Sequence, residues 1–338
     1  MIRFADRAAF EAALNALPRP DSNAADAAAA RQAELTKPPG SLGRLEDIAR
    51  FMAAWQGTAR PRADRIRAAV FAGNHGVAAQ GVSAFPPAVT AQMVANFNAG
   101  GAAINALARA CGAELCVVPL NLDSPTGDIT IEPAMSEAKC LEALNAGAAV
   151  LDSAVDLLIV GEMGIGNTTP AAALCAQSFG GEASDWVGRG SGIDDDGIAR
   201  KVLAVAHALA CHEKACDGPF ETLRHLGGRE IAAMAGAILA ARMKRIPVLL
   251  DGFICCAAIA PLVAAVPAIT DHCLAAHCSA EAGHIRLLKQ LELKPLLHLD
   301  MRLGEGSGAA VAAQVVRCAL AAHNEMATFA EAAVAGAI

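Results

Sequence analysis

The sequence predicts an α/β protein with an open, mostly parallel sheet that carries helices on both faces. Three observations support this fold class. Short apolar runs of β type alternate with helical segments along most of the 338 residues, which indicates a parallel sheet covered on both sides. Polar, glycine-rich loops follow several of these runs, as they do at the ligand-binding edge of open α/β sheets. The length suits one large domain with a smaller appendage.

The expected elements are a helical region, a loop, and then strands and helices in alternation. Residues 6–35 are rich in alanine and predict helix, interrupted near Pro18 and Pro20. Prolines and glycines exclude regular structure in 36–46, and apolar residues at helical spacing from Leu45 onward restart a helix. Strands are expected at 68–72, 115–120, 157–160, 248–250 and 295–299. Helices are expected around 87–110, 136–155, 198–212 and 308–322.

The two ends of the chain are expected to form one small helical domain, residues 1–60 together with about 309–338. The segment 61–308 is then the large, Rossmann-like α/β domain. The longest apolar run, 253–269, is interrupted by Pro261 and Pro267. A membrane span needs about 20 uninterrupted apolar residues, so we expect a buried strand followed by a buried helix there.

Composition argues against several classes of protein. The formal net charge is −7, the sequence pI is near 5.7 and only 4% of residues are aromatic, which argues against a nucleic-acid-binding protein. The N-terminus is charged and lacks the apolar segment of a signal peptide, so we expect a cytoplasmic protein. Eleven cysteines are scattered without a regular spacing, as is typical of buried thiols in a reducing compartment.

A cluster of histidines and cysteines between 271 and 284 raises the question of a metal site. Its potential ligands are His272, Cys273, His277, Cys278 and His284. Their spacings match no zinc template. We therefore expect structural histidines and free thiols, and no metal.

The glycine-rich segment 161–170 runs from a strand into a helix. Thr169 is expected as the N-cap and Pro170 as the first helical residue. Amides at a helix N-terminus, beside glycines that permit close approach, can bind phosphate. The G-x-x-G-x-G spacing matches neither the dinucleotide motif nor a Walker loop. On spacing alone, the segment is either an anion site or a tight structural turn.

A second glycine-rich segment, 187–196, ends in three aspartates that can cap the following helix. Lys201 lies in the first turns of that helix. It is either a solvated surface charge or, close to two glycine loops, a point cation for a phosphate.

Glu305 lies between Gly304 and Gly306 in the segment that follows the last expected strand. Flanking glycines cost backbone entropy and leave room for a ligand. A partly desolvated glutamate has a raised pKa and can act as a general base near neutral pH. The alternative is a loop glutamate that accepts hydrogen bonds from backbone amides, and composition alone favours that alternative.

Together these segments resemble the nicotinate-nucleotide–dimethylbenzimidazole phosphoribosyltransferase family, which makes the lower nucleotide of cobalamin. The resemblance covers about four-fifths of the chain, and its motifs are weak singly but specific jointly. The matching segments are 37–43, 72–77, 161–170, 188–195, 251–253, 277–281 and the Glu305 loop. Two positions depart from the family pattern: Asn74 stands where an acid is common, and Ala282 where proline is usual.

The resemblance implies a reaction in which nicotinate mononucleotide and a benzimidazole give α-ribazole 5′-phosphate and nicotinate, with inversion at the anomeric carbon. An imidazole-type base must lose its proton as it attacks, and Glu305 is the implied general base. The departing nicotinate becomes neutral at its ring nitrogen, so neither a metal nor a cofactor is implied. A carboxylate near the developing oxocarbenium ion would stabilise it, and Glu162 is the candidate.

The resemblance also implies the binding residues and the assembly. The residues assigned to the phosphate and ribose are Gly164, Gly166, Asn167, Thr168, Gly188, Gly190, Ser191 and Lys201. Gly304 and Gly306, on either side of Glu305, are also assigned to substrate binding. Phe85, Met93 and Met163 are expected to line the base pocket. Because they are large and apolar, we expect aromatic bases beyond dimethylbenzimidazole to be accepted. Family members form homodimers in which the small domain of one subunit closes the partner's site, and the segment 37–42 suits this role.

Two other functions remain as alternatives. A nicotinamide-dinucleotide-dependent oxidoreductase predicts the standard dinucleotide glycine spacing and an acid at the end of the next strand, and neither is clear. A non-catalytic nucleotide-binding accessory protein predicts that Glu305 is dispensable.

Overall fold

A five-stranded parallel sheet in the order β2-β1-β3-β4-β5 forms the centre of the protein. The computed structural model describes residues 2–152, 154–190 and 192–335. The strands of the sheet are β1 (Ile66–Ala72), β2 (Ala113–Pro119), β3 (Leu157–Met163), β4 (Val248–Leu250) and β5 (Cys273–Ala275). A smaller parallel sheet pairs β6 (His277–Cys278) with β7 (Leu297–His298). The α/β fold class predicted from the sequence is confirmed.

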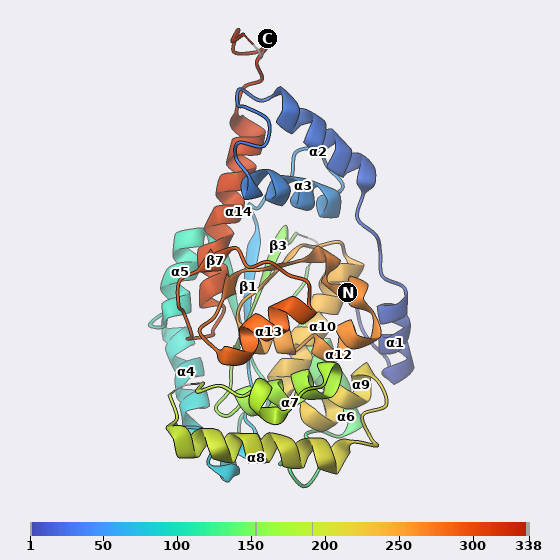
Figure 1. Ribbon diagram of the computed structural model, residues 1–338, viewed down its shortest axis with the longest axis vertical. Coiled ribbons are helices and arrows are strands. Elements are labelled where there is room, and N and C mark those ends of the chain that lie inside the picture. Colours follow the sequence, from blue (N-terminus) through green and yellow to red (C-terminus); the bar gives the residue numbers. More distant parts are fainter. Residues whose placement is uncertain (1, 153, 191, 336–338) are drawn as a thin grey trace.

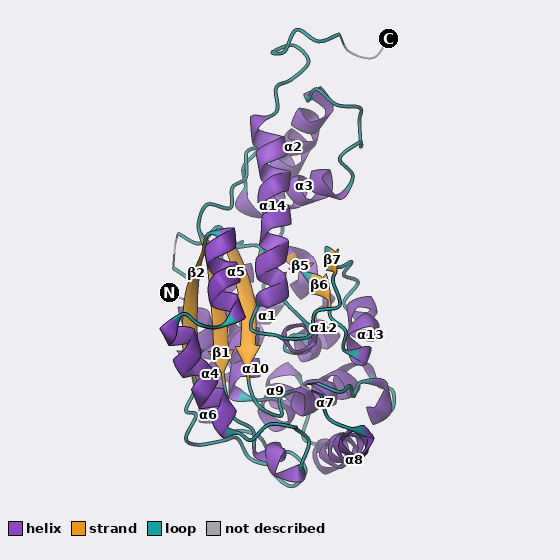
Figure 2. Ribbon diagram, turned by 90° about the vertical axis from the view of Figure 1, so that its left-hand side faces the viewer, coloured by secondary structure: helices purple, strands orange, loops and turns teal. Residues whose placement is uncertain are grey.

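Helices cover both faces of the sheet (Figures 1 and 2). The core on one side includes residues of α1 (Arg7–Asn15), α6 (Glu137–Ala149), α7 (Thr168–Phe179), α8 (Asp195–His212), α9 (Pro219–Leu226), α10 (Arg229–Met243), α11 (Phe253–Ala257), α12 (Ala260–Ala265) and α13 (Ala282–Gln290). The core on the other side includes residues of α3 (Arg44–Gln56), α4 (Ala88–Ala99), α5 (Ala103–Cys111) and α14 (Ser307–Glu325). Short 3-10 helices are η1 (Gly76–Gln80), η2 (Ala183–Asp185) and η3 (Pro267–His272).

The central strands are mostly apolar because both of their faces are buried. In β1, Ala69 and Phe71 belong to the first core, whereas Ala68 and Val70 belong to the second. Successive side chains of a strand point to opposite faces, so a strand with helices on both sides reads as a continuous apolar run. For this reason the apolar runs of the sequence predicted the long strands β1, β2 and β3 correctly.

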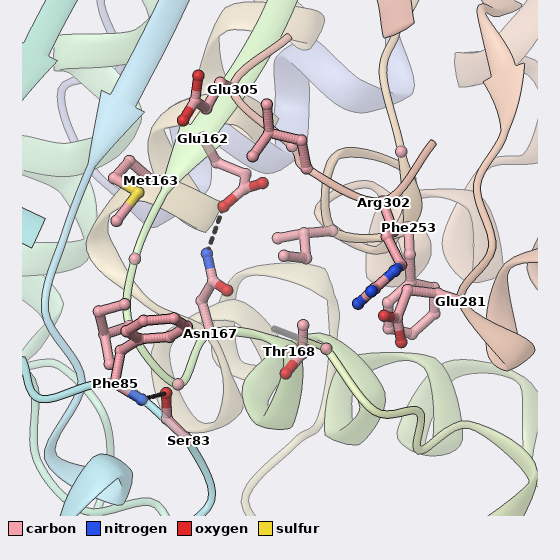
Figure 3. A pocket seen from close by; sticks show the side chains of 18 of the residues that line it. Ser83, Phe85, Glu162, Met163, Asn167, Thr168, Phe253, Glu281, Arg302 and Glu305 are labelled. Atoms are coloured by element: carbon pink, nitrogen blue, oxygen red, sulfur yellow. Dashed lines mark hydrogen bonds between the residues drawn. The ribbon is translucent and has the colours of Figure 1, made fainter. Parts of the chain in front are cut away.

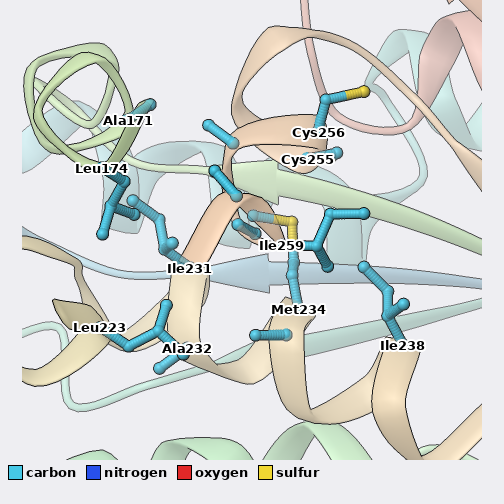
Figure 4. Packing of buried hydrophobic residues seen from close by; sticks show 14 of the residues in the cluster. Ala171, Leu174, Leu223, Ile231, Ala232, Met234, Ile238, Cys255, Cys256 and Ile259 are labelled. Carbon is cyan, nitrogen blue, oxygen red and sulfur yellow. The ribbon is translucent and has the colours of Figure 1, made fainter. Parts of the chain in front are cut away.

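The cysteines of α11 are part of this packing. Figure 4 shows Cys255 and Cys256 among buried side chains of α7, α9 and α10. Burial raises the pKa of both thiols well above the usual value. They are therefore uncharged core residues, as the sequence predicted.

Helices from the two ends of the chain lie together away from the sheet (Figures 1 and 2). There α3 packs against α2 (Ser22–Glu34) and α14. Arg31 of α2 donates hydrogen bonds to the carbonyl oxygens of His323 and Asn324 at 2.8 and 3.1 Å, near the end of α14. In contrast, α1 contacts α9 and α10 beside the sheet. The division into a small and a large domain stays a prediction.

Several elements differ from their prediction. The run 253–269 contains no strand: it forms α11, α12 and the start of η3, because Pro261 and Pro267 fit the first turn of a helix and cannot donate within a sheet. The expected helix 87–110 is two helices, since Gly100 ends α4 in the left-handed conformation. The run 295–299 provides only the two-residue strand β7, outside the central sheet.

The strands β5 and β6 were not predicted. Each has three residues or fewer, and they lie in the segment whose histidines and cysteines drew attention as potential ligands. Two of these histidines have structural contacts instead. His272 lies within hydrogen-bonding distance of the carbonyl oxygens of Ile238 and Ile269, and His284 contacts Ser279 and Cys256.

Two glycines allow α6 and α10 to pack at very short range. A Cβ atom at Gly147 of α6 would overlap the carbonyl group of Ala233, and one at Gly236 of α10 would overlap that of Leu144. We expect Gly236→Ala to lower the free energy of unfolding by about 1–3 kcal/mol, because the helices must separate. Helix propensity alone predicts a gain of about 1 kcal/mol. Urea denaturation measures the sign, and a rise would contradict this packing.

Among the described residues, no helix combines the length and the apolar character needed to cross a membrane.

Candidate active site

A cavity of about 350 Å³ opens where β3 ends (Figure 3). The sheet order reverses between β1 and β3, with β2 on one side and β4 on the other, and ligands of open α/β sheets bind at such a switch point. The two strands pair along their whole length, with Ala72 opposite Met163. Their following loops therefore leave the sheet at the same level, and the Gly73 N–H donates to the Met163 carbonyl at 3.0 Å.

The cavity brings together most residues that the sequence singled out. The predicted residues on its wall are Phe85, Met93, Glu162, Met163, Gly164, Gly166, Asn167, Thr168, Gly190, Lys201, Gly304 and Glu305. Gly188 and Gly306 are not among the residues that line the cavity. The Gly188 carbonyl accepts a hydrogen bond from Lys201, and the Gly306 N–H donates to Asp251. Ser191 lies outside the described residues.

The β3–α7 loop enters α7 without a side-chain cap. Asn167 is the N-cap and α7 begins at Thr168, so the expectation of Thr169 as the N-cap is wrong by two residues. The Asn167 side chain instead donates to a Glu162 carboxylate oxygen at 2.5 Å. Asn167 and Thr168 line the cavity, so the positive end of α7, whose amides no side chain caps, faces it and can receive an anion.

Lys201 from α8 places a cation at this helix end. Its side chain is only 1% exposed, and its Nζ donates to Thr168 Oγ1 and to the Gly188 carbonyl, both at 3.0 Å. Burial lowers its pKa to about 8, although Glu281 opposes the shift. Lys201 is thus a largely desolvated cation whose position is fixed by hydrogen bonds. Gly188 contributes to the site because its carbonyl oxygen accepts one of them.

Glu305 adopts a backbone conformation that is rare for a residue with a side chain. Its φ is +63°, between Gly304 at +82° and Gly306 at +80°. Such a conformation costs about 1–2 kcal/mol for an L-residue, and outliers of this kind concentrate at functional sites. The Glu305 side chain is 4% exposed, and its Oε2 has no hydrogen-bond partner in the described part of the chain.

Contacts from two strand ends hold the Glu305 loop. The Glu305 N–H donates to the Glu162 carbonyl at 3.2 Å. Asp251, directly after β4, accepts from the N–H groups of Gly306 at 3.2 Å and Ala309 at 2.8 Å, and so caps α14 from a distant part of the chain. A Cβ atom at Gly304 would overlap the Glu162 carboxylate. Glycine at this position therefore brings the two glutamates close together.

Three buried carboxyl groups in or beside the cavity, Glu162, Asp251 and Glu305, have raised pKa values. Burial raises the pKa of Glu162 to about 8, against the hydrogen bond from Asn167. Burial raises the pKa of Asp251 to about 7, although backbone hydrogen bonds from the start of α14 oppose it. Burial also raises the pKa of Glu305, and the backbone of Ile104 partly offsets the shift. The cavity thus contains carboxyl groups that can exchange protons near neutral pH.

An apolar wall lies next to these carboxyl groups. It consists of Phe85, Val89, Met93, Met163 and Ile165. Phe85 is 49% exposed and, with Met163, lies on one side of the cavity in Figure 3. A surface of this kind suits the face of an aromatic ring.

Sequence reasoning assigned no role to several residues of the site. Asp251, Phe253, Ser279 and Glu281 were recognised only as parts of matching motifs, His277 also as a potential metal ligand, and Arg302 was given no role. All of them except Asp251 line the cavity. The available signal was position: each lies in a segment that follows a strand of one of the two sheets, where polar side chains tend to bind ligands.

Comparison with known proteins places the chain among close relatives. A family model described as phosphoribosyltransferase matches residues 17–334. A protein of Novosphingobium aromaticivorans named nicotinate-nucleotide–dimethylbenzimidazole phosphoribosyltransferase is 68% identical over 99% of both chains, and one of Roseobacter denitrificans with the same name is 59% identical over 95% of both. The crystal structure of CobT from Thermus thermophilus superposes with a TM-score of 0.87 at 39% identity, covering 93% of this chain and 100% of that one.

Proposed function

This chain belongs to the nicotinate-nucleotide–dimethylbenzimidazole phosphoribosyltransferase family, and from that premise we propose how its cavity performs the reaction. The enzyme transfers the 5-phosphoribosyl group of nicotinate mononucleotide to 5,6-dimethylbenzimidazole or a related aromatic base. The products are α-ribazole 5′-phosphate and nicotinate, in the assembly of the lower nucleotide of cobalamin. The observation that best supports the mechanism is Glu305, buried with an unpartnered oxygen beside an apolar wall.

Glu305 is the general base. One ring nitrogen of the bound benzimidazole attacks the anomeric carbon with its lone pair, and the proton of the other nitrogen passes to the Glu305 carboxylate. The bond from the anomeric carbon to the pyridinium nitrogen breaks, and its electron pair neutralises that nitrogen. A raised pKa brings the Glu305 carboxylate closer to the operating pH and makes it a stronger base.

Glu162 stabilises the developing oxocarbenium ion. With its pKa raised to about 8, its carboxyl group is mostly protonated at neutral pH while the cavity is empty. The pyridinium of the nucleotide brings a positive charge to this carboxyl group and favours its ionised form. The ionised carboxylate then opposes the positive charge that develops on the ribose.

Lys201 and the start of α7 bind the 5′-phosphate. The phosphate meets the helix N-terminus, Thr168 and the Lys201 ammonium. Gly190 leaves room for it, because a Cβ atom there would lie 3.3 Å from both Lys201 Nζ and Thr168 Oγ1. A buried ammonium with a fixed position contributes more to such binding than a solvated lysine does.

We expect Lys201→Met to raise KM for nicotinate mononucleotide by about 10- to 100-fold, the range for a lost hydrogen bond to a charged group. Steady-state kinetics with nicotinate riboside, which lacks the phosphate, should show almost no effect of the substitution. Lys289→Met removes an exposed lysine of α13 and serves as the control. An equal loss on both substrates would contradict a phosphate role for Lys201.

Incubation of the protein with nicotinate mononucleotide and dimethylbenzimidazole tests the function directly. The expected result is that nicotinate is released and α-ribazole 5′-phosphate is formed. If neither product appears, the proposed function is refuted.

Adenine and a phenol extend the assay to base specificity. Because Phe85, Met93 and Met163 offer an apolar surface with few polar contacts, we expect several bases to react. Exclusive use of dimethylbenzimidazole would contradict that expectation.

We also propose a cytoplasmic homodimer. All eleven cysteines are free thiols, which fits a reducing compartment. The segment 38–41 is exposed, yet its flanks are held by the Lys37–Glu46 ion pair at 2.8 Å and by a hydrogen bond from the Leu42 N–H to Glu46 at 3.0 Å. A fixed, exposed loop suits contact with a partner subunit. Sedimentation velocity measures the state of assembly, and a monomer at catalytic concentration would exclude the dimer.

A further inference from the structure

Arg302 is an available cation on the wall of the cavity. Its side chain is exposed, and within the described ranges it has neither a hydrogen bond nor an ion pair. The backbone beside it is fixed, because the Ala280 N–H donates to the Met301 carbonyl at 3.1 Å. The other cation of the cavity, Lys201, is already held by Thr168 and the Gly188 carbonyl. The two cations are therefore suited to different anionic groups.

Arg302 and the apolar wall for the base lie on different sides of the cavity. Figure 3 places the Arg302 side chain beside Phe253 and Glu281. Phe85 and Met163 lie across the cavity from them. No ion pair joins Glu281 and Arg302 in the described structure. Glu281 instead packs against Gly188 and opposes the lowering of the Lys201 pKa.

The chemistry of the proposed reaction requires two such sides. In a displacement with inversion, the entering and leaving groups lie on opposite faces of the carbon. If the base enters from the side of Phe85 and Met163, nicotinate leaves toward the side of Phe253 and Arg302. Nicotinate carries a carboxylate, and the planar guanidinium of arginine matches a carboxylate with two parallel hydrogen bonds.

We propose that Arg302 binds the carboxylate of the nicotinate ring, with the ring against Phe253, and thereby selects nicotinate mononucleotide over nicotinamide mononucleotide. The inference rests on the proposed function and specifies the leaving-group side of the same cavity. The nucleotide has two anionic groups, a phosphate and a carboxylate, and the cavity provides one cation for each. Nicotinamide is uncharged at the corresponding position and has a single amide oxygen there, so it forms neither an ion pair nor two parallel hydrogen bonds with Arg302.

The position of Arg302 adds a link to catalysis. It lies three residues before Glu305 in the same loop. Main-chain hydrogen bonds hold this loop at Met301 and Glu305, and the Asp251 carboxylate holds it at the Gly306 N–H. A nucleotide bound through its carboxylate is therefore fixed relative to the general base. Arg302 binds the substrate, whereas Glu305 carries out the proton transfer.

The test compares both nucleotides with wild type and with Arg302→Met. We expect kcat/KM for nicotinate mononucleotide to fall by about 10- to 100-fold, the range for a lost hydrogen bond to a charged group, and kcat/KM for nicotinamide mononucleotide to change by less than about threefold. Inhibition by free nicotinate should weaken by a similar factor, which provides a readout independent of turnover. Arg302→Lys keeps the charge but not the paired geometry. Its kcat/KM for nicotinate mononucleotide should lie between the values of the wild type and of Arg302→Met.

Two controls keep the outcomes separate. Arg62→Gln removes an exposed arginine that pairs with Asp156 outside the cavity and should leave both substrates unaffected. Circular dichroism checks that the Arg302 variants are folded. An equal loss on both nucleotides would assign Arg302 to the phosphate, and no loss would remove it from the site; either result overturns the inference. Failure of the wild type to release nicotinate would instead refute the proposed function.

Discussion

Replacing Glu305 by glutamine should lower kcat by about 10²- to 10⁴-fold, the usual contribution of a general base. Glutamine has nearly the same shape but does not accept the proton of the attacking ring. The dissociation constant of dimethylbenzimidazole, measured by calorimetry, should change by less than about threefold because the apolar wall is untouched. A variant that retains most of the wild-type rate would exclude Glu305 as the base.

The pH profile separates a chemical from a structural role of Glu305. Only the ionised carboxylate is a base, so wild-type kcat/KM should fall as the pH drops below the raised pKa of Glu305. The residual activity of Glu305→Gln should lose the part of the acidic limb that Glu305 causes and keep only the part that Glu162 causes. Glu305→Gly is a matched stability control: it removes a buried, unpartnered oxygen and relieves the φ of +63°. Urea denaturation should show that this inactive variant is at least as stable as the wild type.

Replacing Glu162 by glutamine should lower kcat by about 10²- to 10³-fold, the range for one electrostatic group aimed at a charged transition state. Glutamine resembles the protonated carboxyl group of the empty cavity and keeps an oxygen for Asn167, so the fold should not change. What is lost is the negative charge that faces the ribose. A kcat close to that of the wild type would show that this charge is unnecessary.

The binding of the nucleotide to Glu162 should release a proton. The pKa of about 8 in the empty cavity must fall when the pyridinium arrives, so at pH 7 the carboxyl group loses its proton. Calorimetry in two buffers of different ionisation enthalpy measures this release, and Glu162→Gln should abolish it.

The raised pKa of Glu162 also affects the free energy of unfolding. Since the folded-state pKa lies above the unfolded value, Glu162 destabilises the fold as pH rises from about 4.5 toward 8, and Glu162→Gln should be more stable than the wild type at pH 8.

Resemblance supplied the reaction, but the residues themselves supplied much of the site. The β3–α7 loop and the Glu305 loop were recognised because each follows a strand and is unusually rich in glycine. They meet although β3 and β7 belong to different sheets, because the Glu305 N–H donates to the Glu162 carbonyl at the end of β3. The interpretation of Lys201 as either a surface charge or a phosphate ligand could not be decided from spacing, because burial depends on what covers α8.

The sequence by itself determined the fold class and the long strands, because hydrophobic pattern and turn chemistry are local properties of a chain. Only the tertiary structure decided which side chains meet. Asp251 caps α14 more than fifty positions along the chain, and Lys201 is held by a loop carbonyl and a threonine of another helix. The left-handed backbone of Glu305 and the raised pKa values of the carboxyl groups likewise follow from contacts and burial that form only when distant segments pack.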